Sequence, residues 1–353
     1  GTLGMIIMLP IIQLLLFGYA INTDPKNLPT AIISEDSTFL TRSIIAGLQN
    51  SEYFRITHHI SSDKQGNELL KQGEVFFVIS IPDNFTQKVI RGAKPEILLQ
   101  ADATDPTAIS NAVSSLNGIT NKVIQENMKG NLAYLKNQPS PFSIIVHKLY
   151  NPEGFTRYNI VPGLIGLVLI FSGVMMTALA ITRERERGTM ENLLSMPVKP
   201  IEIMIGKIMP FVFIGIFQVI IVLLIAYFLF SIPILGSILL LFLCSLLFIV
   251  CNLAIGFLIS TIAKNQTQAL QMSVFVILPS IVMTGFLFPF QAMPMWAQAI
   301  AKCIPLTYFL RISRGIILKG ADFIDIFPNL WHLGVIVAIL TIITLHVYKN
   351  SLD

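Results

Sequence analysis

Few side chains in this sequence are placed to do chemistry. His58 and His59 are adjacent in a predicted strand, where successive side chains point to opposite faces, so we expect a solvated pair and not a shared metal site. Gly206-Lys207 lacks the upstream glycine of a nucleotide-binding P-loop, and Ile208 stands where that motif has Ser or Thr. Neither G-x-S-x-G nor H-E-x-x-H occurs. The sequence therefore predicts no catalytic site, metal or cofactor in this chain.

The three cysteines form no metal or disulfide pattern. Cys244 and Cys251 lie seven residues apart within one apolar segment, and Cys303 follows another. Because no C-x-x-C spacing occurs, we expect all three side chains to pack.

The most informative polar segment runs from Arg183 to Lys207. The alternating charges of RERER favour a helix that leaves an apolar span and continues into water, and Gly188 is a typical helix stop. Thr189 is positioned to cap a short helix over 190–196, which Pro197 ends. Such a helix suits docking of a soluble protein, and the alternative is a loop that lies on the lipid surface.

The composition indicates a membrane protein with one water-soluble insert. The chain has 353 residues, 54% hydrophobic and 12% charged, with a net charge of +4 and a mean hydropathy of +0.71. Soluble domains carry roughly 25% charged residues. Residues 22–158 hold 13 of the 24 Lys and Arg and 13 of the 20 Asp and Glu. This distribution excludes a single soluble domain, a disordered chain and a nucleic-acid-binding protein.

Six segments are long and apolar enough to cross the hydrocarbon layer, which takes about 20 residues of helix. They are Leu3–Ile21, Ile160–Thr182, Ile208–Phe230, Ile238–Ile262, Ala269–Phe288 and Leu330–Tyr348. Their interiors contain no Asp, Glu, Lys or Arg, so a self-powered, ion-coupled carrier is not indicated. Amides such as Gln218 and Asn252 are expected to bond between helices or to line a substrate route.

The positive charges predict the orientation. The loop between the second and third spans carries five Lys and Arg, which places it in the cytoplasm. Both chain ends are then cytoplasmic and residues 22–158 extracytoplasmic. Four positive residues between the last two spans run against this rule. The sequence begins with Gly1 and not with Met, so we also expect a cytoplasmic segment ahead of Gly1.

Residues 22–158 alternate apolar and amphipathic stretches. TAIISED, EYFRITHHI, EVFFVISI and PEILLQAD are predicted strands, and SIIVHKL is a candidate fifth. Helices are expected over 38–49, 63–72, 84–91 and 106–135. The alternation favours an α/β or α+β domain.

The polar segment and its flanks resemble the ABC-2 family of ATP-binding-cassette transporter permeases. The resemblance is carried by ERERGTMENLLSMPVKPIEIMIGKIMPF, LISTIAKNQTQALQM and LFPFQAMPMWAQAIAKCIPLTYFLRISRGIILKG, and it extends over essentially the whole chain. It implies an all-α polytopic membrane protein with six transmembrane helices, the ABC-2 or type V fold, and an inserted extracytoplasmic domain. The closest subgroup is the bacterial multidrug-type permeases of the inner membrane.

The resemblance also implies partners. Two copies of an ABC ATPase, which bind the ATP and magnesium, would pair with two permease protomers as a homodimer or a paired heterodimer. The segment 188–200 would be the coupling helix that the ATPase receives. Its contact residues would be Glu184, Glu186, Arg187, Gly188, Thr189, Met190, Glu191, Leu193, Leu194 and Pro197.

Residues 289–327 would form a re-entrant helical hairpin on the outer face. Trp296 and Tyr308 would then lie in the interfacial aromatic belt. Arg311 and Arg314, three residues apart, share one helix face. They are expected to reach lipid headgroups, or alternatively to contact an anionic substrate near the exit.

The sequence thus predicts the membrane subunit of an exporter for hydrophobic or amphipathic compounds, drug-like or lipid-like, with ATP hydrolysis in a separate subunit. The rival prediction is a membrane anchor or signalling protein whose insert binds a periplasmic or envelope partner.

Overall fold

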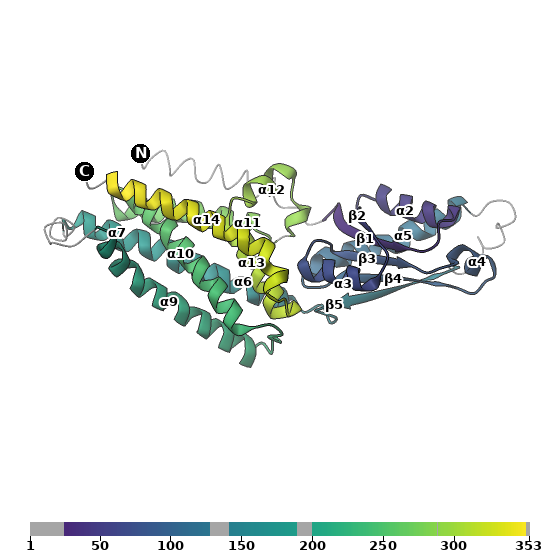
Figure 1. The fold of residues 1–353 in the computed structure, drawn as a ribbon. Coiled ribbons are helices and arrows are strands. Elements are labelled where there is room, and N and C mark those ends of the chain that lie inside the picture. Colours follow the sequence, from purple (N-terminus) through teal and green to yellow (C-terminus); the bar gives the residue numbers. More distant parts are fainter. Residues whose placement is uncertain (1–24, 128–140, 189–199, 288, 351–353) are drawn as a thin grey trace. The chain divides into compact units, whose positions relative to one another are not determined.

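A computed structural model describes residues 25–127, 141–188, 200–287 and 289–350. The chain forms two compact units, one of residues 22–159 and one of residues 160–353 together with residues 1–21. The predicted span Leu3–Ile21 lies outside the described residues. Figure 1 shows the strands of the first unit and the long helices of the second.

Residues 22–159 contain a five-stranded mixed sheet. Its strands are β1 (Leu28–Ser34), β2 (Phe54–Ile60), β3 (Phe77–Ile81), β4 (Glu96–Asp102) and β5 (Ser143–Leu149). The spatial order is β2-β1-β3-β4-β5, and only the β3–β4 pair is antiparallel. All five predicted strands, including the candidate fifth, are therefore present.

Helices cover both faces of this sheet. They are α2 (Phe39–Asn50), α3 (Asp63–Gln72), α4 (Phe85–Ile90) and α5 (Pro106–Asn127). Strand β1 contributes to a hydrophobic core on each face of the sheet, because its alternate side chains point to opposite faces. Leu28 and Ile32 join the core beneath α2, α4 and α5, whereas Ala31 and Ile33 join Leu70 of α3.

Asp36, just after β1, ties the starts of two helices together. Its Oδ1 accepts the N–H of Thr38 at 3.0 Å and its Oδ2 accepts the N–H of Thr86 at 2.9 Å. The hydroxyls of Thr38 and Thr86 also hydrogen-bond to each other. Burial of Asp36 opposes its ionisation, but the hydrogen bonds from Thr86 and Thr38 outweigh burial and lower its pKa.

The second unit is helical. Its elements are α6 (Thr156–Ile170), η2 (Phe171–Met176), α7 (Thr177–Glu186), α9 (Pro200–Phe228), α10 (Ile238–Ile262), α11 (Gln266–Met283), η3 (Phe290–Ala292), α12 (Met295–Ala301), α13 (Pro305–Lys319) and α14 (Phe323–Asn350). Five stretches among the described residues have the length and composition of membrane spans. They are Thr156–Glu186, Ile208–Phe228, Ile238–Ile262, Gln266–Met283 and Phe323–Thr344.

The largest differences from the predicted span boundaries are in α9, α11 and α14. Helix α9 begins at Pro200, eight residues before the predicted start of the third span at Ile208. Helix α11 stops at Met283, five residues before the predicted end at Phe288, and Gly285 adopts a φ of +84°. That left-handed conformation suits glycine and ends the helix. Helix α14 begins at Phe323, so its first residues overlap the end of the hairpin predicted over 289–327.

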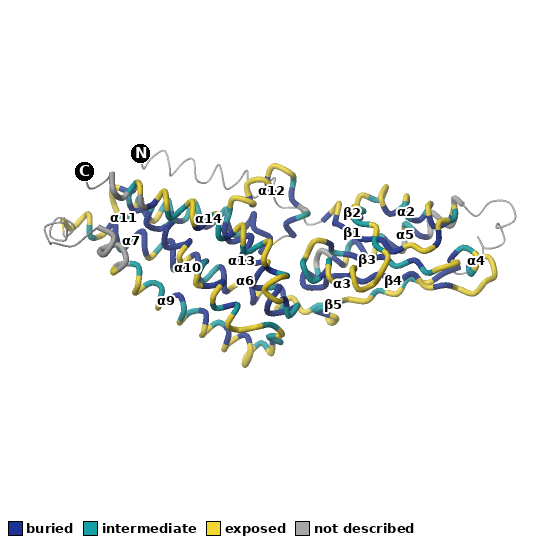
Figure 2. Tube along the Cα trace, viewed as in Figure 1, coloured by how far each residue is buried: buried dark blue, intermediate teal, exposed yellow. Residues whose placement is uncertain are grey.

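Helix α10 lies at the centre of this unit. It packs against α7, α9, α13 and α14. In contrast, much of α9 is exposed or half-buried (Figure 2). Its exposed residues include large apolar side chains such as Phe213, Phe217 and Phe228. Because no water-soluble protein would expose such a surface at this extent, it suits contact with lipid or with another apolar chain.

Candidate functional site

Of the ten predicted ATPase-contact residues, four are described, at the end of α7 and just after it. Glu184, Glu186, Arg187 and Gly188 lie within the described residues. Thr189, Met190, Glu191, Leu193, Leu194 and Pro197 lie outside them. The helix does run through RERER, as the alternating charges predicted. Gly188 has a φ of +68°, and its N–H donates to the carbonyl of Arg185, so the predicted helix stop is confirmed.

Two polar side chains fasten this helix end to the turn between α10 and α11. Arg185 Nη1 donates to the carbonyl oxygen of Thr261, near the end of α10, at 3.2 Å. Glu186 accepts twice from Gln266, the first residue of α11. Its Oε1 accepts the backbone N–H at 2.9 Å and its Oε2 accepts the side-chain amide at 2.6 Å.

Glu186 of α7 therefore accepts hydrogen bonds at the N-terminus of another helix, α11. The first N–H groups of a helix have no partner within it. Asn265 caps α11 by accepting the N–H of Gln268, and Glu186 supplies an acceptor for the N–H of Gln266. A carboxylate at this position is also favoured by the positive end of the helix dipole. Sequence reasoning did not identify Gln266 or this contact. The available signal was Asn265, a typical N-cap residue.

Arg314 fastens the opposite end of α11. It projects from α13, and its Nη1 donates to the carbonyl oxygen of Gly285 at 2.9 Å. Its Nη2 lies 3.5 Å from the carbonyl oxygen of Phe286. Gly285 and Phe286 follow α11, which ends at Met283, so Arg314 holds the turn just after the helix. The guanidinium group thus binds backbone carbonyls, and the expected contact with lipid headgroups or a substrate stays a prediction.

The other three residues of the predicted outer set are spread over two helices. Arg311 of α13 is exposed and lies over the ring of Phe290, 4.5 Å from its centroid. Tyr308 is only 7% exposed, donates its hydroxyl to the carbonyl oxygen of Lys302 at 2.9 Å and stacks on His332. Trp296 of α12 is 45% exposed. Tyr308 is thus buried by packing, and the placement of Trp296 and Tyr308 in an aromatic belt stays a prediction.

A π-helical segment, η2, interrupts the span that leads to the coupling segment. Such segments are rare and occur often at functional sites. Close packing accompanies η2, because a Cβ at Gly173 would lie 2.8 Å from Cβ of Asn252. A Cβ at Gly256 of α10 would lie 2.6 Å from the carbonyl oxygen of Val174. Small residues at both positions let the two backbones approach.

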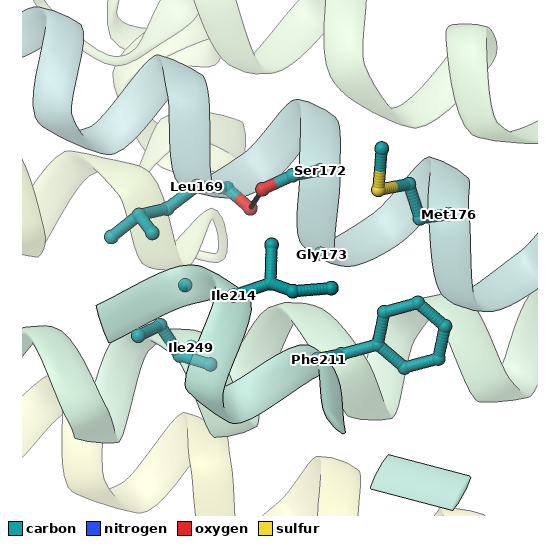
Figure 3. A pocket seen from close by; sticks show the side chains of 8 residues that line it. Leu169, Ser172, Gly173, Met176, Phe211, Ile214 and Ile249 are labelled. Atoms are coloured by element: carbon teal, nitrogen blue, oxygen red, sulfur yellow. Dashed lines mark hydrogen bonds between the residues drawn. The ribbon is translucent and has the colours of Figure 1, made fainter. Parts of the chain in front are cut away.

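A small hollow lies between η2, α9 and α10 (Figure 3). Its lining residues are Leu169, Ser172, Gly173, Met176, Phe211, Ile214, Gly215 and Ile249. Its cavity volume of about 10 Å³ is roughly that needed to hold one water molecule and is far below the roughly 300–1,000 Å³ typical of drug-sized ligand sites. Its lining contains no acid, base or nucleophile beyond one hydroxyl, so the hollow indicates neither a ligand site nor a reaction.

No metal site is found among the described residues, since no three His, Cys, Asp or Glu side chains gather there. The described residues instead provide structural contacts between helices. Hydrogen bonds from Glu186 and Arg314 hold the start of α11 and the turn after it, and close helix packing surrounds η2.

Comparison with known proteins identifies relatives along nearly the whole chain. A model of the ABC-2 family transporter proteins matches residues 1–346. The chain is 30% identical over 319 residues to the probable multidrug ABC transporter permease YbhS of Escherichia coli (strain K12), covering 89% of this chain and 83% of the relative. It is 31% identical over 310 residues to the inner membrane transport permease YhhJ of the same strain, covering 85% and 79%. It is 24% identical over 318 residues to ABC transporter G family member 20 of Dictyostelium discoideum, covering 88% of this chain and 43% of that one.

Proposed function

The chain belongs to the ABC-2 transporter family and is a multi-pass membrane permease subunit, and we propose that it moves hydrophobic or amphipathic compounds out of the cytoplasm or the inner leaflet. The observation that carries the proposal is the family match over residues 1–346. The names of YbhS and YhhJ, a probable multidrug permease and an inner membrane permease, support drug-like cargo and a bacterial inner membrane.

The energy for export comes from a separate ABC ATPase in this proposal. The chain has no P-loop of its own, and its spans have no interior charge with which to couple an ion gradient. Two ATPase copies bind ATP and magnesium, and each engages the coupling segment 188–200 of one protomer. ATP-driven closure of the ATPases then switches a permease dimer between two arrangements.

The topology belongs to the same proposal. Six spans, the first over residues 3–21, place both chain ends in the cytoplasm, and residues 22–158 form an inserted extracytoplasmic domain. Residues 289–327 form a re-entrant hairpin at the outer face. The shortness of α12 and α13, seven and 15 residues, supports the hairpin, because a span takes about 20 residues.

Affinity purification in mild detergent tests the partnership. We expect an ATPase with a P-loop to co-purify with the full chain, and hydrophobic dyes to stimulate its ATP hydrolysis. Leu194→Asp places a charge in the predicted docking helix and should abolish co-purification, whereas Leu194→Met should retain it. Equal ATPase yields with Leu194→Asp and the unchanged chain would contradict this use of the segment.

Labelling in intact cells tests the topology. Cys303 is the one exposed cysteine among those described, so the background variant is Cys303→Ser. A membrane-impermeant maleimide should label Glu35→Cys, which lies in the sheet unit, and should spare Thr189→Cys until the membrane is opened. Labelling of Thr189→Cys from outside would reverse the orientation and remove the coupling segment from the reach of any ATPase.

A further inference from the structure

Helix α11 is hydrogen-bonded to other helices at its first residue and through the turn that follows its last residue. At its first residue, Gln266, the backbone N–H and the side-chain amide both donate to Glu186 of α7. Beyond its last residue, Met283, the carbonyl oxygen of Gly285 accepts from Arg314 of α13. Arg314 and Arg311 together hold the residues that lead from α11 into α12.

The position of Glu186 makes the first fastening informative. One residue separates it from Gly188, where the predicted coupling segment 188–200, the docking segment, begins, and that segment leads to α9. Gln266 is 80 residues away along the chain. Helix α7 thus connects the docking segment to α11, to which Glu186 is hydrogen-bonded.

The bonds at this joint are suited to transmit a displacement. Both acceptors belong to one carboxylate, and hydrogen bonds to charged groups are stronger than neutral ones. The pair of bonds fixes the direction of the Gln266 side chain as well as the start of the helix. Helix α7 and α11 also pack side by side, so a shift of one presses on the other.

We propose that Glu186 and Gln266 form a joint that passes movement of the docking segment to α11, and that α11 passes it to residues 284–301. Gln266 is in this sense a positioning residue for transport. The inference rests on the proposed function, because the movement originates in an ATPase. It differs from docking itself, since Gln266 lies outside the docking segment.

Pulsed electron spin resonance on the full complex tests the joint. The spin label is attached to Met295→Cys in a Cys303→Ser background, because Met295 of α12 is 85% exposed and lies in the segment that α11 would move. Distances between the labels of the two protomers are recorded with and without ATP, magnesium and vanadate. ATP hydrolysis by the co-purified ATPase is measured on the same samples.

Gln266→Leu should leave ATPase binding and basal hydrolysis within about twofold of the unchanged complex. The population whose label distance shifts with ATP should fall about tenfold, the equivalent of one lost hydrogen bond to a charged group. The exchange Glu186→Gln with Gln266→Glu restores an amide–carboxylate pair and should restore the shift. The matched control is Gln268→Leu in the same turn, whose side chain accepts the N–H of Lys264.

The outcomes separate the two proposals. An unchanged ATP-driven shift in Gln266→Leu, or no recovery in the exchanged pair, overturns the joint and leaves the exporter intact. The joint is also overturned if the complex with unchanged Glu186 and Gln266 transports dye while the distance between the labels at residue 295 does not change with ATP. If no ATPase co-purifies with the chain, the proposed function itself fails, and the joint fails with it.

Discussion

The hydroxyl of Ser172 lies 2.7 Å from Oε1 of Gln218 and joins the π-helical segment η2 to α9. The same hydroxyl lies 2.8 Å from the carbonyl oxygen of Val168, one turn earlier. A hydroxyl carries one proton, so the two acceptors share a single donor. Of the two roles expected for Gln218, the structure shows bonding between helices.

The Ser172–Gln218 contact should contribute modestly to stability. Hydrogen bonds between membrane helices contribute about 0.6 kcal/mol on average, because the separated helices find other partners. We expect Ser172→Ala, Gln218→Leu and the double variant to show a coupling free energy of about 0.5–1.5 kcal/mol in unfolding from detergent. Strictly additive effects of the two substitutions would show that the contact contributes nothing.

The close approach of η2 and α10 should make Gly256 intolerant of a side chain. Gly256→Ala places a methyl group within 2.6 Å of the carbonyl oxygen of Val174 and 2.9 Å of Cβ of Thr177. Backbone must then move, so we expect a loss of about 1–3 kcal/mol, measured as a lower thermal unfolding midpoint.

Gly334 of α14 provides the matched control for Gly256. A Cβ at Gly334 meets no atom within 4 Å. Because alanine favours helix over glycine by roughly 1 kcal/mol, Gly334→Ala should be neutral or stabilising. The prediction is wrong if the two alanine variants unfold at the same temperature.

Asp36 should make the starts of α2 and α4 sensitive to acid. Its pKa in the folded protein is below the ordinary value of 3.8, so the folded state binds its proton less readily than the unfolded state. The stabilisation is complete above that value and is lost as the pH falls through the lowered pKa. Hydrogen-exchange protection of residues 38–50 and 85–91 should therefore decrease in that range.

The substitution Asp36→Asn tests how much the negative charge of the Asp36 carboxylate contributes. Asparagine keeps one acceptor oxygen, so one of the two N–H groups of Thr38 and Thr86 loses its partner. At neutral pH we expect exchange in α2 and α4 to rise about tenfold, as for loss of a hydrogen bond to a charged group. Asp83→Asn, at an exposed carboxylate that pairs with Lys88, should change it little. Equal effects of the two variants would remove the special role of Asp36.

Arg314 should stabilise the end of α11 through its planar guanidinium group. Arg314→Lys retains the charge but carries all of its N–H donors on one nitrogen, so it cannot reach Gly285 and Phe286 with two separate nitrogens as the guanidinium group does. We expect both Arg314→Lys and Arg314→Met to raise hydrogen exchange over residues 284–292. Arg311→Met, which removes a contact with the Phe290 ring, should have a smaller effect. A larger effect at Arg311 would contradict this ranking.

The sequence alone determined the local elements. Strand Ser143–Leu149, helix Asp63–Gln72 and helix Ile238–Ile262 begin and end at the predicted residues. Period-two alternation, capping residues and apolar length are local signals, and a membrane helix must satisfy its backbone within its own segment. For the same reason the end of α7 at Glu186, just before Gly188, could be predicted.

Tertiary structure decided which residues meet across the chain. Arg311 and Arg314 were expected to act alike from one helix face, yet one lies over an aromatic ring and the other binds carbonyls beyond α11. No local sequence pattern predicts the Glu186–Gln266 pair or the close approach of Gly256 to η2. Such contacts depend on how separate helices pack, and packing energy between distant segments is not encoded in the spacing of neighbouring residues.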